Sequence, residues 1–211
     1  MGILIVNDYA SCTHLASPRI VRTEKFICAL AHSPIILSTN FIEDCLSNNI
    51  CLDPKNYLLE DSKYETDSQY RLSNALSRAK ENKGRLLRGY AIYVTENVHG
   101  GFNTYKSIIE VNGGKCLMYR ARAGSTTTSR AGPDDDTDDS ESSQPDYVYL
   151  VSGQTPEEAK LWPKFRQMVA ASGKNPRVVR NDWLLNTTLS QQHQWRDVYA
   201  LTDKDIVNPP T

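Results

Sequence analysis

The chain has 211 residues, of which 39% are hydrophobic and 23% are charged, and its net charge is −1. This length accommodates one large domain or two small ones. No apolar run approaches the roughly 20 residues that span a bilayer, and the run at residues 3–6 lacks the basic flank of a signal peptide. The composition therefore excludes a membrane-spanning protein and indicates an intracellular one.

The first part of the chain predicts short strands that alternate with helices. Apolar residues recur with helical spacing over 22–32 and again on one side of a helix that holds Phe41, Ile42, Cys45 and Leu46. Residues 48–64 are expected to form a loop that lies on the fold. The remaining elements expected here are strands at 2–6, 13–16 and 35–37 and an amphipathic helix at 68–80.

The second part repeats a similar order of elements. We expect strands at 90–94, 115–119, 147–151 and 177–179, and helices at 103–111, 156–171 and 181–189. Alternating strands and helices favour parallel sheets with helices on their faces, so the fold class is α/β. The two parts share one plan, in which the first lacks an opening strand and helix.

An acidic stretch separates two of these strands. Residues 131–145 contain six acids and no base, and removing the six acids leaves 24 basic against 19 acidic side chains, a net charge of +5. We predict a disordered insertion at about 120–145. Ser143-Gln144 fits a damage-kinase site, but a solvated loop with a chance dipeptide is the favoured interpretation.

The most informative stretch is residues 12–28. It predicts a strand, a turn at Ser17-Pro18 and then a helix whose first turn carries Arg22, Thr23 and Lys25. Cations are unfavourable at a helix N-terminus unless an anion sits between them. The pattern therefore points to a phosphate or another anion. The alternative for Lys25 is an ordinary solvated lysine. The alternative for Arg22 is an ion pair with a carboxylate across the domain interface.

Other chemistry-bearing residues have simpler interpretations. The five cysteines contain no C-x-x-C pair and are expected to act as small apolar residues. Trp183 is expected in the core, and His14 is expected to be a hydrogen-bonded structural histidine. No nucleophile motif or carboxylate pair indicates catalysis, so we expect no enzyme, no metal and no cofactor.

The residues Thr13-His14-Leu15-Ala16, Arg22-Thr23-x-Lys25-Phe26, Gly113-Gly114 and Trp183 resemble the signature of BRCT domains, arranged as a tandem pair. Phe41 occupies the place of that tryptophan in the first repeat. Among tandem pairs, the chain looks most like the C-terminal pairs of PTIP and of fungal multi-BRCT DNA-damage-response scaffolds. The resemblance implies two small parallel sheets flanked by helices, over almost the whole chain.

This resemblance implies three segments. A BRCT repeat without its opening strand and helix occupies residues 1–60, a linker with a helix occupies 61–85, and a second repeat with the acidic insertion occupies 86–205. The chain is expected to begin at the second strand of the first repeat. The hydroxyl and glycine that the family supplies from the end of its first strand are then expected upstream of Met1.

The resemblance also implies a phosphopeptide reader. Lys25 matches the phosphate-binding lysine, Thr23 a residue that supports the pocket, and Arg22 the residue that holds the peptide three residues after the phosphate, or its carboxylate. The far wall of the groove is expected from His99-Gly100-Gly101 and Arg180-Asn181. The implied partner is a damage-phosphorylated histone H2-A tail or a similar phospho-Ser-Gln C-terminal motif.

Two further expectations follow from the family. The protein is expected in the nucleus, bound to other DNA-repair proteins and not to membranes, with direct DNA contact weak or absent. The alternative function is a phospho-independent protein–protein interaction module of a nuclear scaffold, because BRCT pairs also bind unphosphorylated partners.

Overall fold

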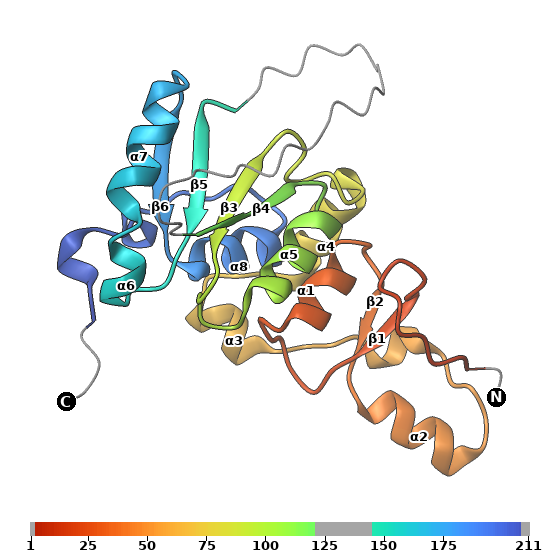
Figure 1. Cartoon of the computed structure of the whole chain (residues 1–211). Helices are drawn as coiled ribbons and strands as arrows, with labels where there is room; N and C mark the ends of the chain where they lie inside the picture. The colour runs from red at the N-terminus through yellow and green to blue at the C-terminus, as the bar shows by residue number, and fades with distance from the viewer. Residues whose placement is uncertain (1–2, 121–144, 208–211) are drawn as a thin grey trace, which may run out of the picture. The chain divides into compact units, whose positions relative to one another are not determined.

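The computed structural model describes residues 3–120 and 145–207 (Figure 1). The chain divides into two compact units, which are residues 1–86 with 185–194, and residues 87–184 with 195–211. The predicted acidic insertion lies outside the described residues, apart from its ends. No helix in the described ranges is long and apolar enough to cross a membrane.

The first unit contains a small sheet with helices around it. Its elements are β1 (His14–Ala16), α1 (Glu24–Leu30), β2 (Ile35–Leu37), α2 (Asn40–Asn48), the 3₁₀ turn η1 (Pro54–Tyr57), α3 (Ser62–Asp67) and α4 (Leu72–Asn82). Strands β1 and β2 are parallel, and Leu58 adds an antiparallel bridge to Leu37. The five residues from Phe26 to Leu30 in α1 are all buried, so this helix forms the centre of the unit.

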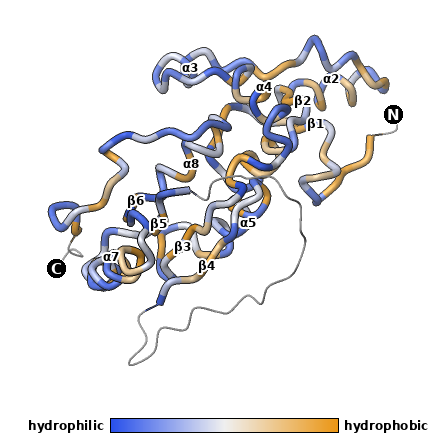
Figure 2. Tube along the Cα trace, turned by 90° about the horizontal axis from the view of Figure 1, so that it is seen from above, coloured by the Kyte–Doolittle hydropathy of each residue, from blue (hydrophilic) through white to orange (hydrophobic). Residues whose placement is uncertain are grey.

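The second unit contains a four-stranded parallel sheet. Its elements are β3 (Ala91–Thr95), α5 (Phe102–Val111), β4 (Lys115–Tyr119), β5 (Tyr147–Val151), α6 (Pro156–Ala159), α7 (Trp162–Ala171), β6 (Asn175–Val179), the first turn of α8 (Asn181–Ser190), η2 (Asp197–Tyr199) and η3 (Asp203–Asp205). The rest of α8, from residue 185, belongs to the first unit. The strand order is β4-β3-β5-β6. Figure 2 shows hydrophobic residues along β3, which is central in this sheet and therefore apolar on both faces. The predicted α/β class is confirmed.

Two tryptophans anchor the second unit. Trp183 is buried, as predicted, and its ring stacks on Tyr149 with the ring centres 3.9 Å apart and an angle of 10° between them. Trp162 is also buried, and its indole N–H donates to the Ser152 hydroxyl at 2.9 Å. These contacts join α7 and the first turn of α8 to β5.

The hydrogen bonds at the sheet edges show which parts of the two units correspond. The N–H that follows β1 donates from Ser17 to the Leu37 carbonyl at 2.8 Å, and the N–H that follows β5 donates from Ser152 to the Val179 carbonyl at 3.0 Å. The elements β1, α1, β2 and α2 therefore match β5, α6–α7, β6 and α8.

The segments after these helices agree with this match. Leu58 bridges Leu37 in the first unit, and Ala200 bridges Val179 in the second. The first described strand of the chain, β1, is thus equivalent to β5, the third strand of the second repeat. Within residues 3–86, the first unit has no counterpart of β3, α5 or β4 in the described sheet.

Some predicted element boundaries are also wrong. Residues 3–6 form no strand, and the side chains of Leu4 and Ile5 are 83% and 90% exposed. Figure 2 shows this segment as a hydrophobic stretch near the N-terminus. The first-unit helix begins at Glu24, because Thr23 caps it. Ile42 and Leu46 of α2 are exposed, whereas Phe41 and Cys45 are buried as predicted.

Two further helices differ from their predictions. The expected helix at 156–171 is divided into α6 and α7, because Pro163 stands in the first turn of α7 and a proline ring would clash with a continuous preceding turn. The linker helix lies at 72–82, and α3 (Ser62–Asp67) begins inside the stretch 48–64 that is expected to be a loop. The shift of the linker helix concerns its ends, which local patterns define poorly.

The Trp183–Tyr149 stack provides a test of the packing. Trp183→Ala is expected to reduce the free energy of unfolding by about 3–5 kcal/mol, because it removes a large buried ring and leaves a cavity. Urea unfolding monitored by circular dichroism measures the loss. Val198→Ala is the control, since Val198 is 64% exposed and its truncation should change stability by less than about 0.5 kcal/mol. Similar losses in both variants would contradict the packing.

The cysteines provide a second test. Burial raises the pKa of the Cys28 and Cys116 thiols to about 12, because the thiolate loses its hydration, whereas Cys51 is exposed. Iodoacetamide at pH 8, followed by mass spectrometry, is expected to modify Cys51 first and to leave Cys28 unmodified until urea unfolds the chain. Early modification of Cys28 in the folded protein would refute the buried, protonated state.

Candidate functional site

The turn between β1 and α1 presents Arg22, Thr23 and Lys25, and all three are exposed. Thr23 is the N-cap of α1 in extended conformation, and its hydroxyl oxygen accepts from the Phe26 N–H at 3.4 Å. Arg22 and Thr23 therefore precede the helix, and only Lys25 stands within its first turn. A hydroxyl that accepts one bond still has its own proton to donate to a ligand.

Lys25 is held on a rigid backbone with its ammonium group in solvent. The side chains that follow it in α1 are buried, which fixes the position of the Lys25 backbone. Its ammonium group makes no hydrogen bond or ion pair with any residue in the described part of the chain. An exposed, unpaired cation on a fixed helix is available to an anionic ligand.

Arg22 is oriented by contacts that are distant in sequence. Its guanidinium donates through Nη1 to Oδ1 of Asn186 at 3.3 Å. It also lies close enough to the phenol of Tyr64 in α3 to oppose the rise that burial causes in the pKa of that group. These neighbours hold the guanidinium beside the turn, and sequence reasoning missed Asn186 because it lies 164 positions away.

In the second unit, one tyrosine connects three of the predicted residues. The Tyr105 hydroxyl donates to the His99 carbonyl at 2.6 Å and accepts from the Asn181 amide at 2.8 Å. Gly100 has a φ of +97°, and a Cβ there would lie 3.0 Å from the same hydroxyl oxygen. The loop before α5 and the start of α8 are thus joined through a side chain that the sequence did not single out.

Arg180 is used differently. Its guanidinium forms an ion pair with Asp205, which also accepts from the Thr202 N–H at 2.9 Å and from the Thr202 hydroxyl at 2.7 Å. Bonds from Thr202, aided by Arg180, lower the pKa of Asp205. Arg180 therefore ties β6 to η3 within the second unit, and its role as a peptide ligand stays a prediction.

The turn in the second unit that is equivalent to residues 22–26 has the opposite charge. Thr155 caps α6 through the Glu158 N–H, as Thr23 caps α1 through Phe26. Counting from these caps, Glu157 stands at the position of Lys25. Acids are favourable at a helix start and cations are not. The first turn of α1 contains Glu24 beside Lys25, and of these two only Lys25 is unfavourable with respect to the helix dipole.

The second-unit turn is closed by its own carboxylate. Glu158 is 3% exposed and accepts from the Thr95 hydroxyl at 2.5 Å, from the Gly153 N–H at 3.1 Å and from the Thr155 hydroxyl at 3.3 Å. Thr95 ends β3 and Gly153 follows β5. A carboxyl group of the chain itself is therefore enclosed between the strand ends and the start of the helix in the second unit.

The described residues hold no group of three or more His, Cys, Asp or Glu side chains that could bind a metal ion. Arg22, Thr23 and Lys25 belong to the first unit, and His99, Gly100, Arg180 and Asn181 belong to the second. A groove that combines the two sets remains a prediction.

Comparisons with known proteins agree on one family. A BRCT domain family model matches residues 85–197, and the model of the Regulator of Ty1 transposition protein 107 BRCT domain matches residues 1–59. Over 95% of this chain, the sequence is 28% identical to BRCT-containing protein 1 of Schizosaccharomyces pombe. Over 58% of this chain, it is 37% identical to human Mediator of DNA damage checkpoint protein 1. It spans only 22% and 6% of these two relatives.

Solved structures show the same fold. The BRCT5-BRCT6 domains of S. pombe Brc1 superpose with a TM-score of 0.67 at 24% identity, over 94% of this chain and 86% of that one. The complex of Rtt107p with phosphorylated histone H2-A gives a TM-score of 0.58 at 16% identity, over 90% of this chain and 76% of that one.

The enclosed carboxylate gives a testable consequence. Glu158→Ala is expected to destabilise the protein, because it leaves the buried donors of Thr95 and Gly153 without an acceptor. Each unsatisfied donor is expected to lower the free energy of unfolding by roughly 1–3 kcal/mol. The midpoint of urea unfolding measures this. The neighbouring Glu157→Ala removes an exposed carboxylate and should change stability little. Equal midpoints for the two variants would contradict the assigned contacts.

Proposed function

The chain belongs to the BRCT domain family, and we propose that it is a phosphoserine-reading module of a DNA-damage-response scaffold. The observation that carries this proposal is the exposed cationic turn of the first repeat. Arg22 and Lys25 stand there, whereas the equivalent turn of the second repeat carries the acids Glu157 and Glu158. Only the first repeat is therefore suited to an external anion.

The second repeat supports the proposal by a structural parallel. There, a strand-end hydroxyl and a backbone N–H surround the Glu158 carboxylate at the start of the second helix. The family resemblance implies the same types of donor around a phosphate in the first repeat, with Lys25 added. In the described part of the first repeat, Lys25 and the Thr23 hydroxyl are the donors proposed for the phosphate.

Arg22 is proposed to hold the peptide beyond the phosphate. Asn186 and Tyr64 orient its guanidinium, and a planar guanidinium suits a terminal carboxylate or backbone carbonyls. His99, Gly100, Arg180 and Asn181 are proposed for the far wall of this groove. Of these, Asn181 and the His99 loop already share the hydroxyl of Tyr105.

The relatives favour a particular class of ligand. One solved relative is in complex with phosphorylated histone H2-A, and another relative is a mediator of the DNA damage checkpoint. We therefore assign to this chain a damage-phosphorylated histone H2-A tail or a similar phospho-Ser-Gln C-terminal motif, read in the nucleus. BRCT repeats are generally interaction modules, and the expected lack of catalytic activity remains a prediction.

Calorimetry with a matched pair of peptides tests the proposal. The probe is a C-terminal Ser-Gln peptide, phosphorylated or not, with a free terminal carboxylate. Lys25→Ala is expected to weaken binding of the phosphopeptide about tenfold to hundredfold, because it removes a charge-assisted bond of about 1.5–3 kcal/mol.

Lys55→Ala is the matched control, since Lys55 is an exposed lysine of the same unit outside the turn. Arg22→Ala is expected to reduce the preference for a free carboxylate over a C-terminal amide. Equal affinity for the two peptides, or equal effects of Lys25→Ala and Lys55→Ala, would refute phosphate reading by this turn.

A further inference from the structure

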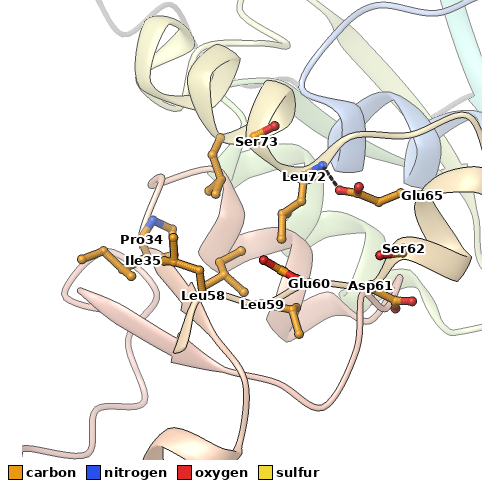
Figure 3. A pocket seen from close by; sticks show the side chains of 12 residues that line it. Pro34, Ile35, Leu58, Leu59, Glu60, Asp61, Ser62, Glu65, Leu72 and Ser73 are labelled. Carbon is orange, nitrogen blue, oxygen red and sulfur yellow. Dashed lines mark hydrogen bonds between the residues drawn. The ribbon is translucent and has the colours of Figure 1, made fainter. Parts of the chain in front are cut away.

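The first unit contains a pocket that the phosphate-reading turn does not use. It has a volume of about 480 Å³ and lies between the start of β2, the segment 58–62 and the helices α3 and α4 (Figure 3). We call it the α4 pocket. Its apolar lining includes Pro34, Ile35, Leu58, Leu72 and Leu76. This volume is within the range of ligand-binding pockets in proteins.

The apolar side chains at the opening of the pocket are exposed to water. Ile35 is 41% exposed and Leu58 is 54% exposed, although the next residues of β2, Ile36 and Leu37, are almost fully buried. A group of exposed apolar side chains beside a pocket is typical of an interaction site.

In the second repeat, side chains of the same repeat pack against the residue at the equivalent position. Because Leu37 corresponds to Val179, Ile35 corresponds to Arg177. The Arg177 guanidinium lies 3.5 Å from the ring centre of Tyr147 and 3.8 Å from that of Trp195. In the first repeat, the described residues form no such cover over Ile35.

The polar part of the lining is acidic. Glu60, Asp61 and Glu65 line the pocket, and none of its lining residues is basic. Asp61 accepts from the Ile20 N–H at 3.0 Å, and Glu65 accepts from the Leu72 N–H at 2.8 Å, drawn as a dashed line in Figure 3.

Glu60 differs from these two acids. It is exposed, and its carboxylate makes no hydrogen bond or ion pair within the described part of the chain. The free negative charge at the pocket is therefore that of Glu60, and it complements a cation.

The backbone beside the pocket is suited to an extended ligand. The Leu59 N–H donates to the Ile36 carbonyl at 2.9 Å, and the Ser38 N–H donates to the Tyr57 carbonyl at 2.8 Å. In this antiparallel pairing the N–H and C=O of Leu58 face away from β2. They are directed to where an added strand would pair.

We propose that the α4 pocket binds an extended segment of a partner protein that is basic and apolar and carries no phosphate. One leucine-sized or isoleucine-sized side chain of the segment enters among Ile35, Leu58, Leu72 and Leu76. A neighbouring lysine or arginine pairs with Glu60. This site belongs to the first repeat alone and is separate from the residues assigned to the phosphate.

Nuclear magnetic resonance with two synthetic peptides tests this proposal. The probes are acetyl-Lys-Leu-Lys-Ile-Lys-amide and its acidic match acetyl-Glu-Leu-Glu-Ile-Glu-amide, each titrated into the ¹⁵N-labelled chain. The basic peptide is expected to shift amide signals of residues 35–36, 58–62 and 72–76, and the acidic peptide is not. Shifts that map elsewhere, or equal binding of both peptides, would overturn the proposal.

Three variants separate the pocket from general charge attraction. Glu60→Lys and Leu58→Ser are each expected to weaken the basic peptide at least tenfold, and both change exposed side chains, so a thermal melt should show a folded protein. Glu43→Lys changes an exposed acid of α2 and makes the same change in net charge as Glu60→Lys. If Glu43→Lys and Glu60→Lys weaken binding of the basic peptide equally, the proposed site is overturned. Unchanged affinity of Glu60→Lys for the phosphopeptide would support two separate sites.

Discussion

The parallel pairing of neighbouring strands within each repeat is the constraint on which the candidate sites depend. A chain that leaves β1 and returns as the parallel strand β2 must cross the sheet, and here α1 makes that crossing. The start of the crossing helix then lies after the carboxyl end of β1. The residues of the turn, Arg22 to Lys25, come to the surface there, whereas the rest of α1 is buried.

The two repeats use this shared geometry with opposite chemistry. In the second repeat, Glu158 fills the space at the strand ends and is bonded by Thr95 and Gly153. In the first repeat, Arg22 and Lys25 occupy the equivalent turn; Arg22 donates to Asn186, and the Lys25 ammonium group remains in solvent. The proposed phosphate reading thus follows from a comparison of the repeats: the second repeat places its own carboxyl group at the strand ends, and the first is proposed to bind a phosphate of a ligand there.

A similar contrast applies at the opposite end of these strands. Arg177, the residue of β6 equivalent to Ile35, lies against the rings of Tyr147 and Trp195, whereas Ile35 at the start of β2 borders an open pocket. Internal comparison of the repeats therefore identifies two positions at which the first repeat differs in surface chemistry from the second. One is basic and is assigned to the phosphate, and the other is apolar with an acidic residue beside it.

The amino-acid sequence by itself determined the alternation of strands and helices, the strands β4 and β5 with their bounds, the burial of Trp183 and the cationic turn, because these depend on local periodicity and residue type. It did not determine the partners of Arg22 and Arg180, the role of Tyr105, the enclosure of Glu158 or the α4 pocket. Those depend on contacts between residues far apart in the chain, such as Arg22 with Asn186. The predicted strand at 2–6 failed for the same reason, since an apolar run becomes a strand only where a neighbouring strand accepts its hydrogen bonds.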